Sequence, residues 1–347
     1  MKGFALYRLP YTKEVKYISG EVTEVMSCVE LSNAQGFVMV PFAPSAEQPL
    51  LVIRPEHQEK EKEAELSLSS IAKSDLSRSD YHIDFLNFHA HLLNGNFQKL
   101  VLSRSLVMER QKENMKPELD STKEADTPLD LFHKACEHYP RMFIALVYTP
   151  KSGLWLAATP EILLAGSGRE WQTVALAGTM PYSEQVTWSD KDIQEQRYVA
   201  TYITEQLEQF TSHFQEDGPH TIRAGHLAHL RSDFRFTLDN PKRIGELLHA
   251  LHPTPAVCGL PKEEAFQFIL HNEHHQRSFY SGFMGPLFVD GDTHLFVTLR
   301  CMQIFQNAYR LYAGGGLLKE STEEREWQET ETKLDTMRNL LRGKRQE

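Results

Sequence analysis

The sequence is poor in cysteine, in long apolar runs and in excess basic charge, and each shortage excludes a class of protein. Four cysteines are scattered over 347 residues without a CxxC pair, which argues against a disulfide framework and a structural zinc knuckle. No run of about 18 apolar residues is present, so we expect no membrane-spanning helix. The N-terminus lacks the apolar stretch of a secretion signal. We therefore predict a cytoplasmic protein.

The charge balance is acidic. Lys and Arg number 37 against 47 Asp and Glu, which gives a formal net charge of -10. Nucleic-acid binding requires clustered basic residues that this sequence does not supply, so we expect no nucleic-acid partner. An anionic ligand would need a local cationic pocket or a metal ion. The hydrophobic fraction of 41% is sufficient for a large globular core.

Strand-like segments rich in aromatic residues, Val and Thr dominate the middle and the end of the chain. Several are joined by short turns, which favour antiparallel pairing because a parallel crossover needs roughly a dozen residues or more. The polar, charged segments 55–80 and 109–127 are predicted to be surface excursions. The predicted strands are 143–149, 154–158, 173–177, 294–299 and 308–313.

A long amphipathic helix is predicted to begin near Ser189 or Asp190, both favourable N-cap residues. Glu195 extends the apolar stripe of this helix backwards by one turn. A carboxylate on the core-facing side of a helix is costly to bury unless it meets a cation or a metal ion. The apolar positions of the stripe are Val199, Ile203, Leu207, Phe210 and Phe214.

A second amphipathic helix is predicted to begin at Ser321, with Glu324 completing a capping box. A glycine run, 313–316, precedes it and would let backbone N–H groups approach a ligand closely. The strand, the glycine turn and the acidic helix together indicate a site for an anion and a divalent cation. The apolar stripe comprises Trp327, Leu334, Met337 and Leu341, and an adjacent stripe carries Glu326, Glu329 and Lys333.

Ten sequence blocks make the chain resemble the chorismate-utilising enzymes, the family of isochorismate, salicylate, anthranilate and aminodeoxychorismate synthases. The resemblance implies a single α+β domain of the anthranilate synthase component I type, with two large antiparallel β-sheets packed together and helices outside. Residues 91–347 would form the chorismate-binding catalytic region, and residues 1–90 a shortened, weakly matched N-terminal part. The blocks are KLVLSR (99–104), ATPEILL (158–164), ALAGT (175–179), SDKDIQEQ (189–196), HLRS (229–232), LHPTPAVCGLP (251–261), EHHQRSFYSG (273–282), TLRC (298–301), YAGGG (312–316) and EWQETETKL (326–334).

The resemblance implies two catalytic residues on the matching positions. Lys99 would be the general base that activates water, and strand alternation places it on one face with Val101 and Ser103. Burial would lower the lysine pKa and make it a base at neutral pH. Glu161 would be the general acid that protonates the departing 4-hydroxyl, a role that requires a raised pKa. Outside this motif, Lys99 would be read as a solvated residue at a strand edge, and Glu161 as a surface turn residue.

The resemblance also implies a magnesium site and a set of substrate contacts. Glu195 and Glu329 would hold Mg²⁺, with Glu326 as a nearby carboxylate, because an oxygen-only shell suits this ion. Lys333 could also form an i,i+4 pair with Glu329, and the two roles are compatible at a pocket wall. The substrate-binding residues would be Gly178, Thr179, His229, Ala256, Tyr280, Arg300, Gly314, Gly316 and Lys333.

The predicted product is isochorismate. The relatives that eliminate pyruvate usually carry threonine where this chain has Ala256, and without that hydroxyl the reaction is expected to stop at isochorismate. The predicted enzyme is therefore an isomerase that feeds menaquinone or catechol siderophore synthesis. A salicylate synthase is the alternative, and an ammonia-dependent anthranilate or aminodeoxychorismate synthase is a remote one. We expect a monomer without an obligatory glutaminase partner.

Two functions from other classes agree less well with the sequence. His271, His274 and His275 could suggest a zinc hydrolase, but HNEHH lacks the HExxH order and a third ligand, so exposed helix histidines are expected. A non-catalytic binding module would require loss of Lys99 or of a glutamate, and all are present. Within the family pattern, Met180 to Tyr182 and Gly315 are departures, but neither removes a residue assigned to chemistry.

Overall fold

A computed structural model describes residues 2–56, 67–71, 77–110, 126–183, 185–225 and 227–342. Most of the two predicted surface excursions, 55–80 and 109–127, lies outside these residues. The helices are α1 (Arg78–Leu93), α2 (Pro128–His138), α3 (Asp190–Leu207), α4 (Ile244–Leu251), α5 (Lys262–Asn272) and α6 (Glu323–Leu341), with 3₁₀ segments at Cys28–Asn33 and Pro241–Arg243.

The described strands form two antiparallel sheets that share one strand, β2 (Val15–Val25). Residues 15–21 of β2 pair with β1, and residues 22–25 pair with β4. One sheet continues from β2 through β1 (Lys2–Arg8), β6 (Phe143–Thr149), β7 (Gly153–Thr159), β15 (Cys301–Ile304), β16 (Ala308–Leu317) and β5 (Lys99–Glu109) to β12 (Gly259–Leu260). The other continues through β4 (Leu50–Ile53), β3 (Gly36–Val40), β13 (Phe283–Leu287), β14 (Asp292–Val297), β8 (Ile162–Ser167), β9 (Glu170–Pro181) and β11 (Leu227–Thr237) to β10 (Phe214–Ala224).

The main core lies between the two sheets. Phe143 of β6 stacks on Phe296 of β14 with ring centroids 4.3 Å apart, and Tyr7 of β1 meets Phe37 of β3 at 5.6 Å. Because side chains alternate along a strand, the odd-numbered residues of β6 face this core, and its even-numbered residues pack beneath α2 and α6. The predicted α+β fold with two packed antiparallel sheets is therefore confirmed.

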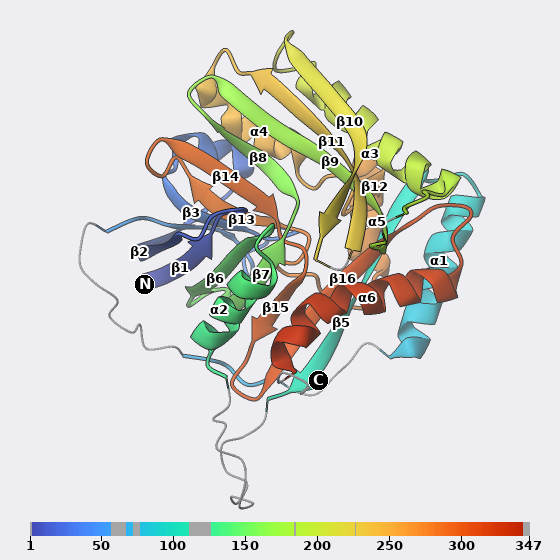
Figure 1. Cartoon of the computed structure of the whole chain (residues 1–347), viewed down its shortest axis with the longest axis horizontal. Coiled ribbons are helices and arrows are strands. Elements are labelled where there is room, and N and C mark those ends of the chain that lie inside the picture. The colour runs from blue at the N-terminus through green and yellow to red at the C-terminus, as the bar shows by residue number, and fades with distance from the viewer. Residues whose placement is uncertain are drawn as a thin grey trace, which may run out of the picture.

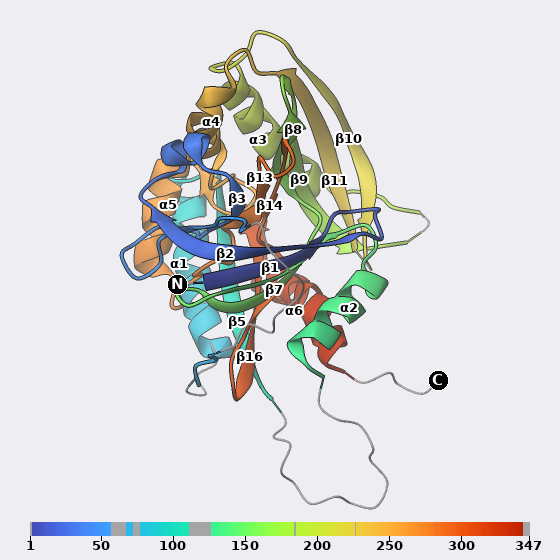
Figure 2. The same cartoon turned by 90° about the vertical axis from the view of Figure 1, so that its left-hand side faces the viewer.

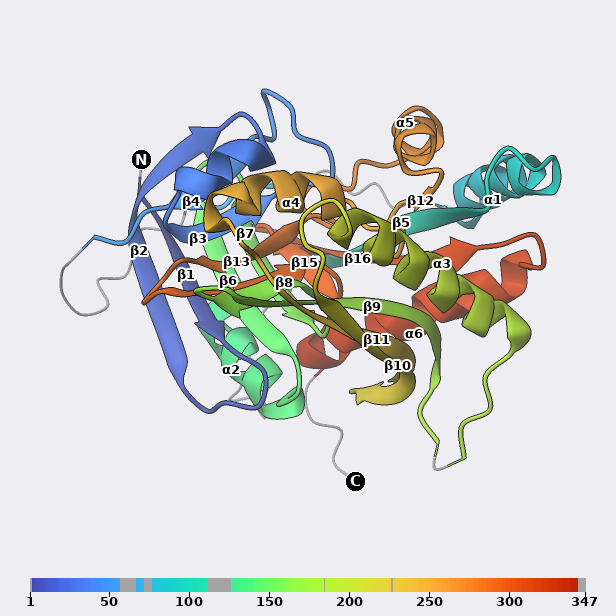
Figure 3. The ribbon, with the colours of Figure 1, turned by 90° about the horizontal axis from the view of Figure 1, so that it is seen from above.

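Helices cover the outer faces of both sheets (Figure 1). Helices α2 and α6 pack on the sheet that contains β6 and β16, whereas α3 packs on β9 and β11 of the other sheet. The side view in Figure 2 shows the long β10–β11 hairpin along one side of the molecule, with its lower end close to α2. Seen from above in Figure 3, α3 and α6 lie in the same half of the molecule, away from the shared strand β2. None of the four cysteines forms a disulfide, and no helix in the described residues is both long and apolar enough to cross a membrane.

Two details of the predicted helices are wrong. Helix α3 begins as predicted, with the Ser189 side chain accepting a hydrogen bond from the Asp192 N–H, but it ends at Leu207. Phe214 instead starts β10 and pairs with Phe236, so strand pairing overrides the helical spacing of the apolar residues. Helix α6 begins at Glu323, and the side chain of its N-cap residue, Thr322, forms no capping hydrogen bond. Ser321 does not form the predicted capping box, because its hydroxyl closes the preceding turn by accepting from the Leu318 N–H.

Candidate active site

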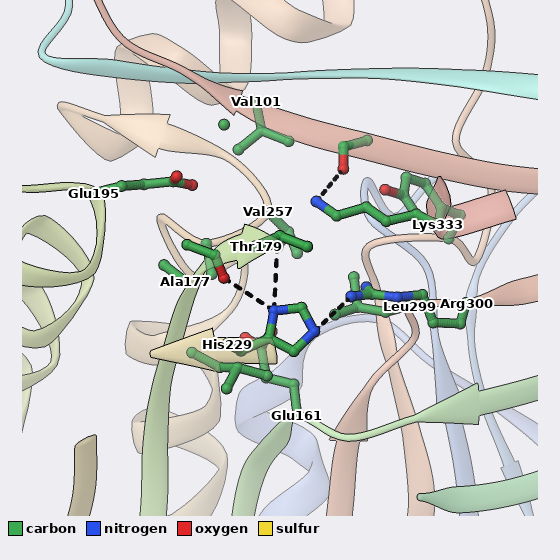
Figure 4. Close-up of a pocket in the computed structure, with 16 residues that line it drawn as sticks. Val101, Glu161, Ala177, Thr179, Glu195, His229, Val257, Leu299, Arg300 and Lys333 are labelled. Atoms are coloured by element: carbon green, nitrogen blue, oxygen red, sulfur yellow. Dashed lines mark hydrogen bonds between the residues drawn. The ribbon is translucent and has the colours of Figure 1, made fainter. Parts of the chain in front are cut away.

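A pocket opens where β9, β11 and β16 meet the N-terminal part of α3 and the middle of α6 (Figure 4). Most of the residues predicted from the sequence to act on or bind the substrate line it: Glu161, Gly178, Thr179, Glu195, His229, Ala256, Tyr280, Arg300, Gly314, Gly316 and Lys333. Five apolar lining residues were not assigned to the site from the sequence: Val101, Leu176, Ala177, Val257 and Leu299. Each lies within a family block, so its place beside a predicted site residue could have identified it. Lys99, Glu326 and Glu329 lie just outside the lining.

Lys99 starts β5 and is completely buried, with its side-chain nitrogen Nζ 3.0 Å from the Glu195 carboxylate. Strand β16 passes alongside, and it can do so only with glycine at 316. A Cβ at this position would lie 2.1 Å from Glu195 Oε1 and 2.9 Å from Lys99 Cε, closer than real Cβ contacts. The glycine run predicted to allow a close approach therefore makes room for a lysine–glutamate pair.

Glu161 follows β7 and lines the same pocket as Glu195, from a different part of the fold. Its side chain is 2% exposed, and among the residues that the structure describes Oε1 has no hydrogen-bond partner. Its backbone is fixed to the neighbouring strand, because the carbonyl accepts a hydrogen bond from the Val297 N–H at 2.9 Å. Burial raises the pKa of Glu161 to about 7, although the nearby cations Arg300, Lys99 and Lys333 oppose the rise. Such a carboxyl can carry a proton near neutral pH.

Three glutamates from α3 and α6 each face one lysine. The nitrogen–oxygen distances are 3.0 Å for Lys99–Glu195, 2.6 Å for Lys191–Glu326 and 2.6 Å for Lys333–Glu329. These six side chains, here called the ion cluster, surround Gly315 and Gly316. A Cβ at Gly315 would lie 3.3 Å from Glu326 Oε2 and 3.5 Å from Glu329 Oε1. Carboxylates on two helices distant in sequence thus converge on adjacent residues of one strand.

Within the ion cluster, the pKa of Glu195 is lowered and the pKa of Glu326 is raised. Burial disfavours ionisation of Glu195, but three lysines outweigh burial and hold its pKa below the ordinary value; they are Lys99, Lys191 and Lys333. Burial and the like charge of Glu329 raise the pKa of Glu326 to about 7, although Lys191 opposes the rise. The number of positive partners within reach decides the difference.

The carboxylate oxygens of the cluster suit a hard cation as ligands, although each glutamate is paired with a lysine. Glu326 Oε2 is buried and has no hydrogen-bond partner, and oxygen donors are what Mg²⁺ prefers. Within the described ranges, however, no three His, Cys, Asp or Glu side chains are grouped as ready metal ligands. The glutamates therefore fit a divalent cation if the lysine side chains move away from them. The assignment of Glu195, Glu326 and Glu329 to Mg²⁺ stays a prediction.

A histidine connects the cationic side of the pocket to its glycine turn. The Arg300 guanidinium donates to His229 Nε2 at 3.1 Å, and His229 Nδ1 lies 3.0 Å from the Gly178 carbonyl and 3.2 Å from Thr179 Oγ1. Because arginine can only donate, Nε2 must accept, so we infer that Nδ1 carries the proton and donates to the Gly178 carbonyl. The neutral imidazole therefore orients Arg300 toward the pocket, as Figure 4 shows.

Lys333 and Tyr280 border the same glycine strand. The Lys333 ammonium donates to the Gly314 carbonyl at 2.8 Å and to Glu329 at 2.6 Å, so the i,i+4 pair and a place at the pocket wall coexist. Tyr280 stacks on Tyr312 with centroids 5.6 Å apart. A Cβ at Gly314 would lie 2.7 Å from the Tyr280 hydroxyl oxygen. The chain thus offers cations, a phenol and backbone groups to an anionic ligand in a small space.

The three histidines of HNEHH do not share a site. His271 is exposed on α5, and His274 lies beyond the end of that helix, where it pairs with Asp84. His275 is also outside the helix, and it is nearly buried with Nε2 2.8 Å from Ser103 Oγ. The prediction of exposed helix histidines is therefore correct for His271 and wrong for His275, because the chain turns inward after Asn272.

Comparisons with known proteins agree on one family. The family model described as "Chorismate binding enzyme" matches residues 45–342. The isochorismate synthase DhbC of Bacillus subtilis is 31% identical over 294 residues, which cover 81% of this chain and 72% of that protein. The isochorismate synthase EntC of Escherichia coli is 31% identical over 200 residues, 54% of this chain. The chain matches about half of the length of EntC, 51%.

Solved structures share the fold over nearly the whole chain. A Bacillus anthracis protein assigned as a 2,3-dihydroxybenzoate-specific isochorismate synthase, DhbC, superimposes with a TM-score of 0.79 at 25% identity, covering 97% of this chain and 95% of that one. MenF, the menaquinone-specific isochorismate synthase of Escherichia coli, superimposes with a TM-score of 0.77 over 98% of this chain and 89% of its own. Its identity of 21% supports likeness of fold alone.

Proposed function

The chain belongs to the family of chorismate binding enzymes, and from this we propose that it is a magnesium-dependent isochorismate synthase. One observation carries the proposal beyond the family: Glu161, a buried carboxyl whose pKa is about 7, shares a pocket with Arg300 and Lys333 and adjoins the Lys99–Glu195 pair. General acid–base chemistry on a dicarboxylate requires this combination of a proton donor, a base and cations.

The proposed reaction exchanges one hydroxyl for another. Lys99, as the neutral amine, accepts a proton from water as the water oxygen bonds to carbon 2 of chorismate. The ring double bonds shift, the bond from carbon 4 to its oxygen breaks, and Glu161 gives its proton to the departing oxygen, which leaves as water. One water enters and one leaves, so the change is a reversible isomerisation without any oxidant.

The remaining pocket residues would bind and orient the substrate. Arg300, held by His229, and Lys333 supply positive charge to the two carboxylates, and Thr179 and Tyr280 supply hydroxyl groups. Backbone groups of Gly178, Gly314 and Gly316 would approach the ligand at the glycine turns. When bound, Mg²⁺ would neutralise a substrate carboxylate, with Glu195 and Glu329 as its protein ligands and Glu326 close by.

The side chain at residue 256 decides between the proposed product and its main alternative. Ala256 lines the pocket without a hydroxyl, so nothing at this position would assist loss of the enolpyruvyl group, and isochorismate is released rather than converted to salicylate. The relatives named above include proteins specific for 2,3-dihydroxybenzoate and for menaquinone formation, so we propose that the product feeds one of these two routes. We further propose a cytoplasmic monomer that needs no glutaminase, and the four free cysteines fit a reducing compartment.

The test is product analysis of the purified protein with chorismate, with and without MgCl₂. Isochorismate formed only in the presence of MgCl₂ would support the proposal. Salicylate with an equal amount of pyruvate would replace it with a salicylate synthase, and an aromatic amine formed on addition of ammonium would replace it with an ammonia-dependent enzyme. No consumption of chorismate under any of these conditions would contradict all three.

A further inference from the structure

Lys191 is the member of the ion cluster for which the proposed reaction has no use. Lys99 and Lys333 have roles at the pocket, but Lys191 lies in the first turn of α3, is 8% exposed and does not line the pocket. Its ammonium donates to Glu326 Oε1 at 2.6 Å, and the Glu326 side chain is fully buried. A buried lysine is costly, so its position among the carboxylates needs a reason.

The charge of Lys191 acts on the whole set of carboxylates. Burial disfavours its charged form, but attraction to Glu326, Glu195 and Glu329 outweighs burial and raises the pKa of Lys191 above its ordinary value. Lys191 is therefore an ammonium ion at physiological pH, and it interacts with every carboxylate predicted to hold the metal. Its positive charge thus interacts with the same three carboxylates that a divalent cation would bind.

Each glutamate of the cluster is already paired with a lysine, at 3.0, 2.6 and 2.6 Å. The addition of a divalent cation alone would therefore leave positive charge uncompensated in a region largely shielded from water. A dicarboxylate substrate brings two negative charges and restores the balance. Metal and substrate are thus expected to stabilise each other's binding, and the third lysine creates that dependence.

We propose that Lys191 is the resident cation of the carboxylate cluster, which compensates the glutamates when no metal is bound and keeps metal affinity low until the dianionic substrate arrives. The proposal rests on the magnesium dependence proposed above. The competing view treats the Lys191–Glu326 pair as a structural tie between α3 and α6. A structural tie predicts that loss of the lysine weakens or leaves unchanged the binding of metal, whereas a resident cation predicts tighter binding.

The experiment measures Mn²⁺ binding to the full-length protein by electron paramagnetic resonance, with and without chorismate. In Lys191→Met the apolar chain is kept and the charge is lost, so Mn²⁺ should bind on the order of tenfold more tightly without chorismate. The gain in affinity that chorismate produces in the wild type should shrink in the variant. Arg325→Met is the matched control: Arg325 lies on α6, pairs with Asp192 at 3.3 Å and is 48% exposed. Loss of this screened charge should change the affinity less than about twofold.

A second variant keeps the test valid if Lys191→Met unfolds. The double variant Lys191→Met/Glu326→Gln removes both charges of a buried pair while keeping its volume, which proteins often tolerate. It should also bind Mn²⁺ without chorismate at least as tightly as the wild type, whereas Glu326→Gln alone should bind it more weakly because Lys191 then turns to the remaining carboxylates.

Two failures can be told apart. A wild-type protein that binds Mn²⁺ in the presence of chorismate, together with lysine variants that bind it no more tightly than the wild type, would overturn the role of Lys191 alone. A wild-type protein that binds no Mn²⁺ with or without chorismate would overturn the metal site itself, and with it this inference.

Discussion

The two walls of the pocket treat the same kind of side chain in opposite ways. On one wall, Glu161 is buried with one oxygen unpaired and a pKa raised to about 7. On the other, Glu195 is also buried, but its lysine neighbours hold its pKa below the ordinary value. The difference teaches that burial alone does not decide the charge of a carboxyl. The charges around the carboxyl decide as well: Lys99 lies 3.0 Å from Glu195, and the lysines there favour the ionised form.

The largest effect is expected from removing the groups that move protons. Glu161→Gln keeps the shape of the acid but cannot give up a proton, and Lys99→Ala removes the base. Each should lower the rate of isochorismate formation by roughly a hundred- to ten-thousand-fold, because this is what general acid–base groups contribute. Rate measurements on both variants, with circular dichroism to check folding, provide the test. A Glu161→Gln variant within a few-fold of the wild-type rate would remove Glu161 from the mechanism.

One added methyl group can disrupt the Lys99–Glu195 pair without touching Glu161. In Gly316→Ala the new Cβ would meet Glu195 Oε1 at 2.1 Å, so the lysine–glutamate pair must separate. We expect at least a tenfold loss of rate and a loss of about 1–3 kcal/mol in the free energy of unfolding, measured by urea denaturation.

The neighbouring glycine provides the control. In Gly315→Ala the nearest atoms are the far ends of Glu326 and Glu329 at 3.3 and 3.5 Å, which can shift by a few tenths of an ångström. This variant should keep most of the activity and stability. Equal damage from the two substitutions would mean that the strand, and not the ion pair, is what the methyl group disturbs.

The pH dependence should sharpen the contrast between the walls. Glu161 must be protonated to act as an acid, so kcat/KM should fall as the pH rises through about 7. The stability has the same sign: a carboxyl whose folded pKa lies above its unfolded value near 4.5 stabilises the fold fully below that value, and the contribution is lost as the pH rises through about 7. Unfolding of the wild type and Glu161→Gln should therefore differ between pH 5 and 8, and parallel curves would show that Glu161 ionises normally.

The smallest effect concerns a hydroxyl beside Glu161. Thr254 is buried, its hydroxyl has no hydrogen-bond partner within the described part of the chain, and its proximity to the Glu161 carboxyl opposes the rise in that pKa. Thr254→Val keeps the shape and removes the hydroxyl, so the midpoint of the pH–rate profile should move upward by a fraction of a unit. Thr254→Ser should restore the wild-type midpoint. A downward shift in Thr254→Val would assign the hydroxyl to the protonated form of the acid instead.

Much of the fold could be predicted from local pattern. The strand at 143–149 was predicted from its aromatic and β-branched residues, and the start of α3 from the N-cap at Ser189, because both signals act within a few residues. The end of α3 could not be predicted, since Phe214 continues the helical spacing while pairing with Phe236 from another strand. The shared strand β2 is not predicted either: it pairs with the adjacent β1, but its residues 22–25 pair with β4, and this change of partner is visible only in the folded chain.

The site shows the same division between local and long-range information. Family motifs predict Lys99 and Glu161 as the catalytic residues, because motif residues carry the chemistry in their type and order. Which charged side chains pair with each other, however, depends on the folded chain. Lys191 lies between two family positions on α3, but only the packing of α3 against α6 reveals that it meets Glu326. Similarly, the orphan oxygen of Glu161 follows from burial and not from its motif.

The most direct test of the opposite behaviour of the two walls is an infrared pH titration, recorded as the difference between wild type and Glu161→Gln. The account predicts that the carbonyl band of a protonated carboxylic acid, present in the wild type and absent from the variant, disappears with a midpoint near pH 7. A Glu161 carboxyl that is already ionised at pH 5 would contradict the assignment of this residue as the proton donor.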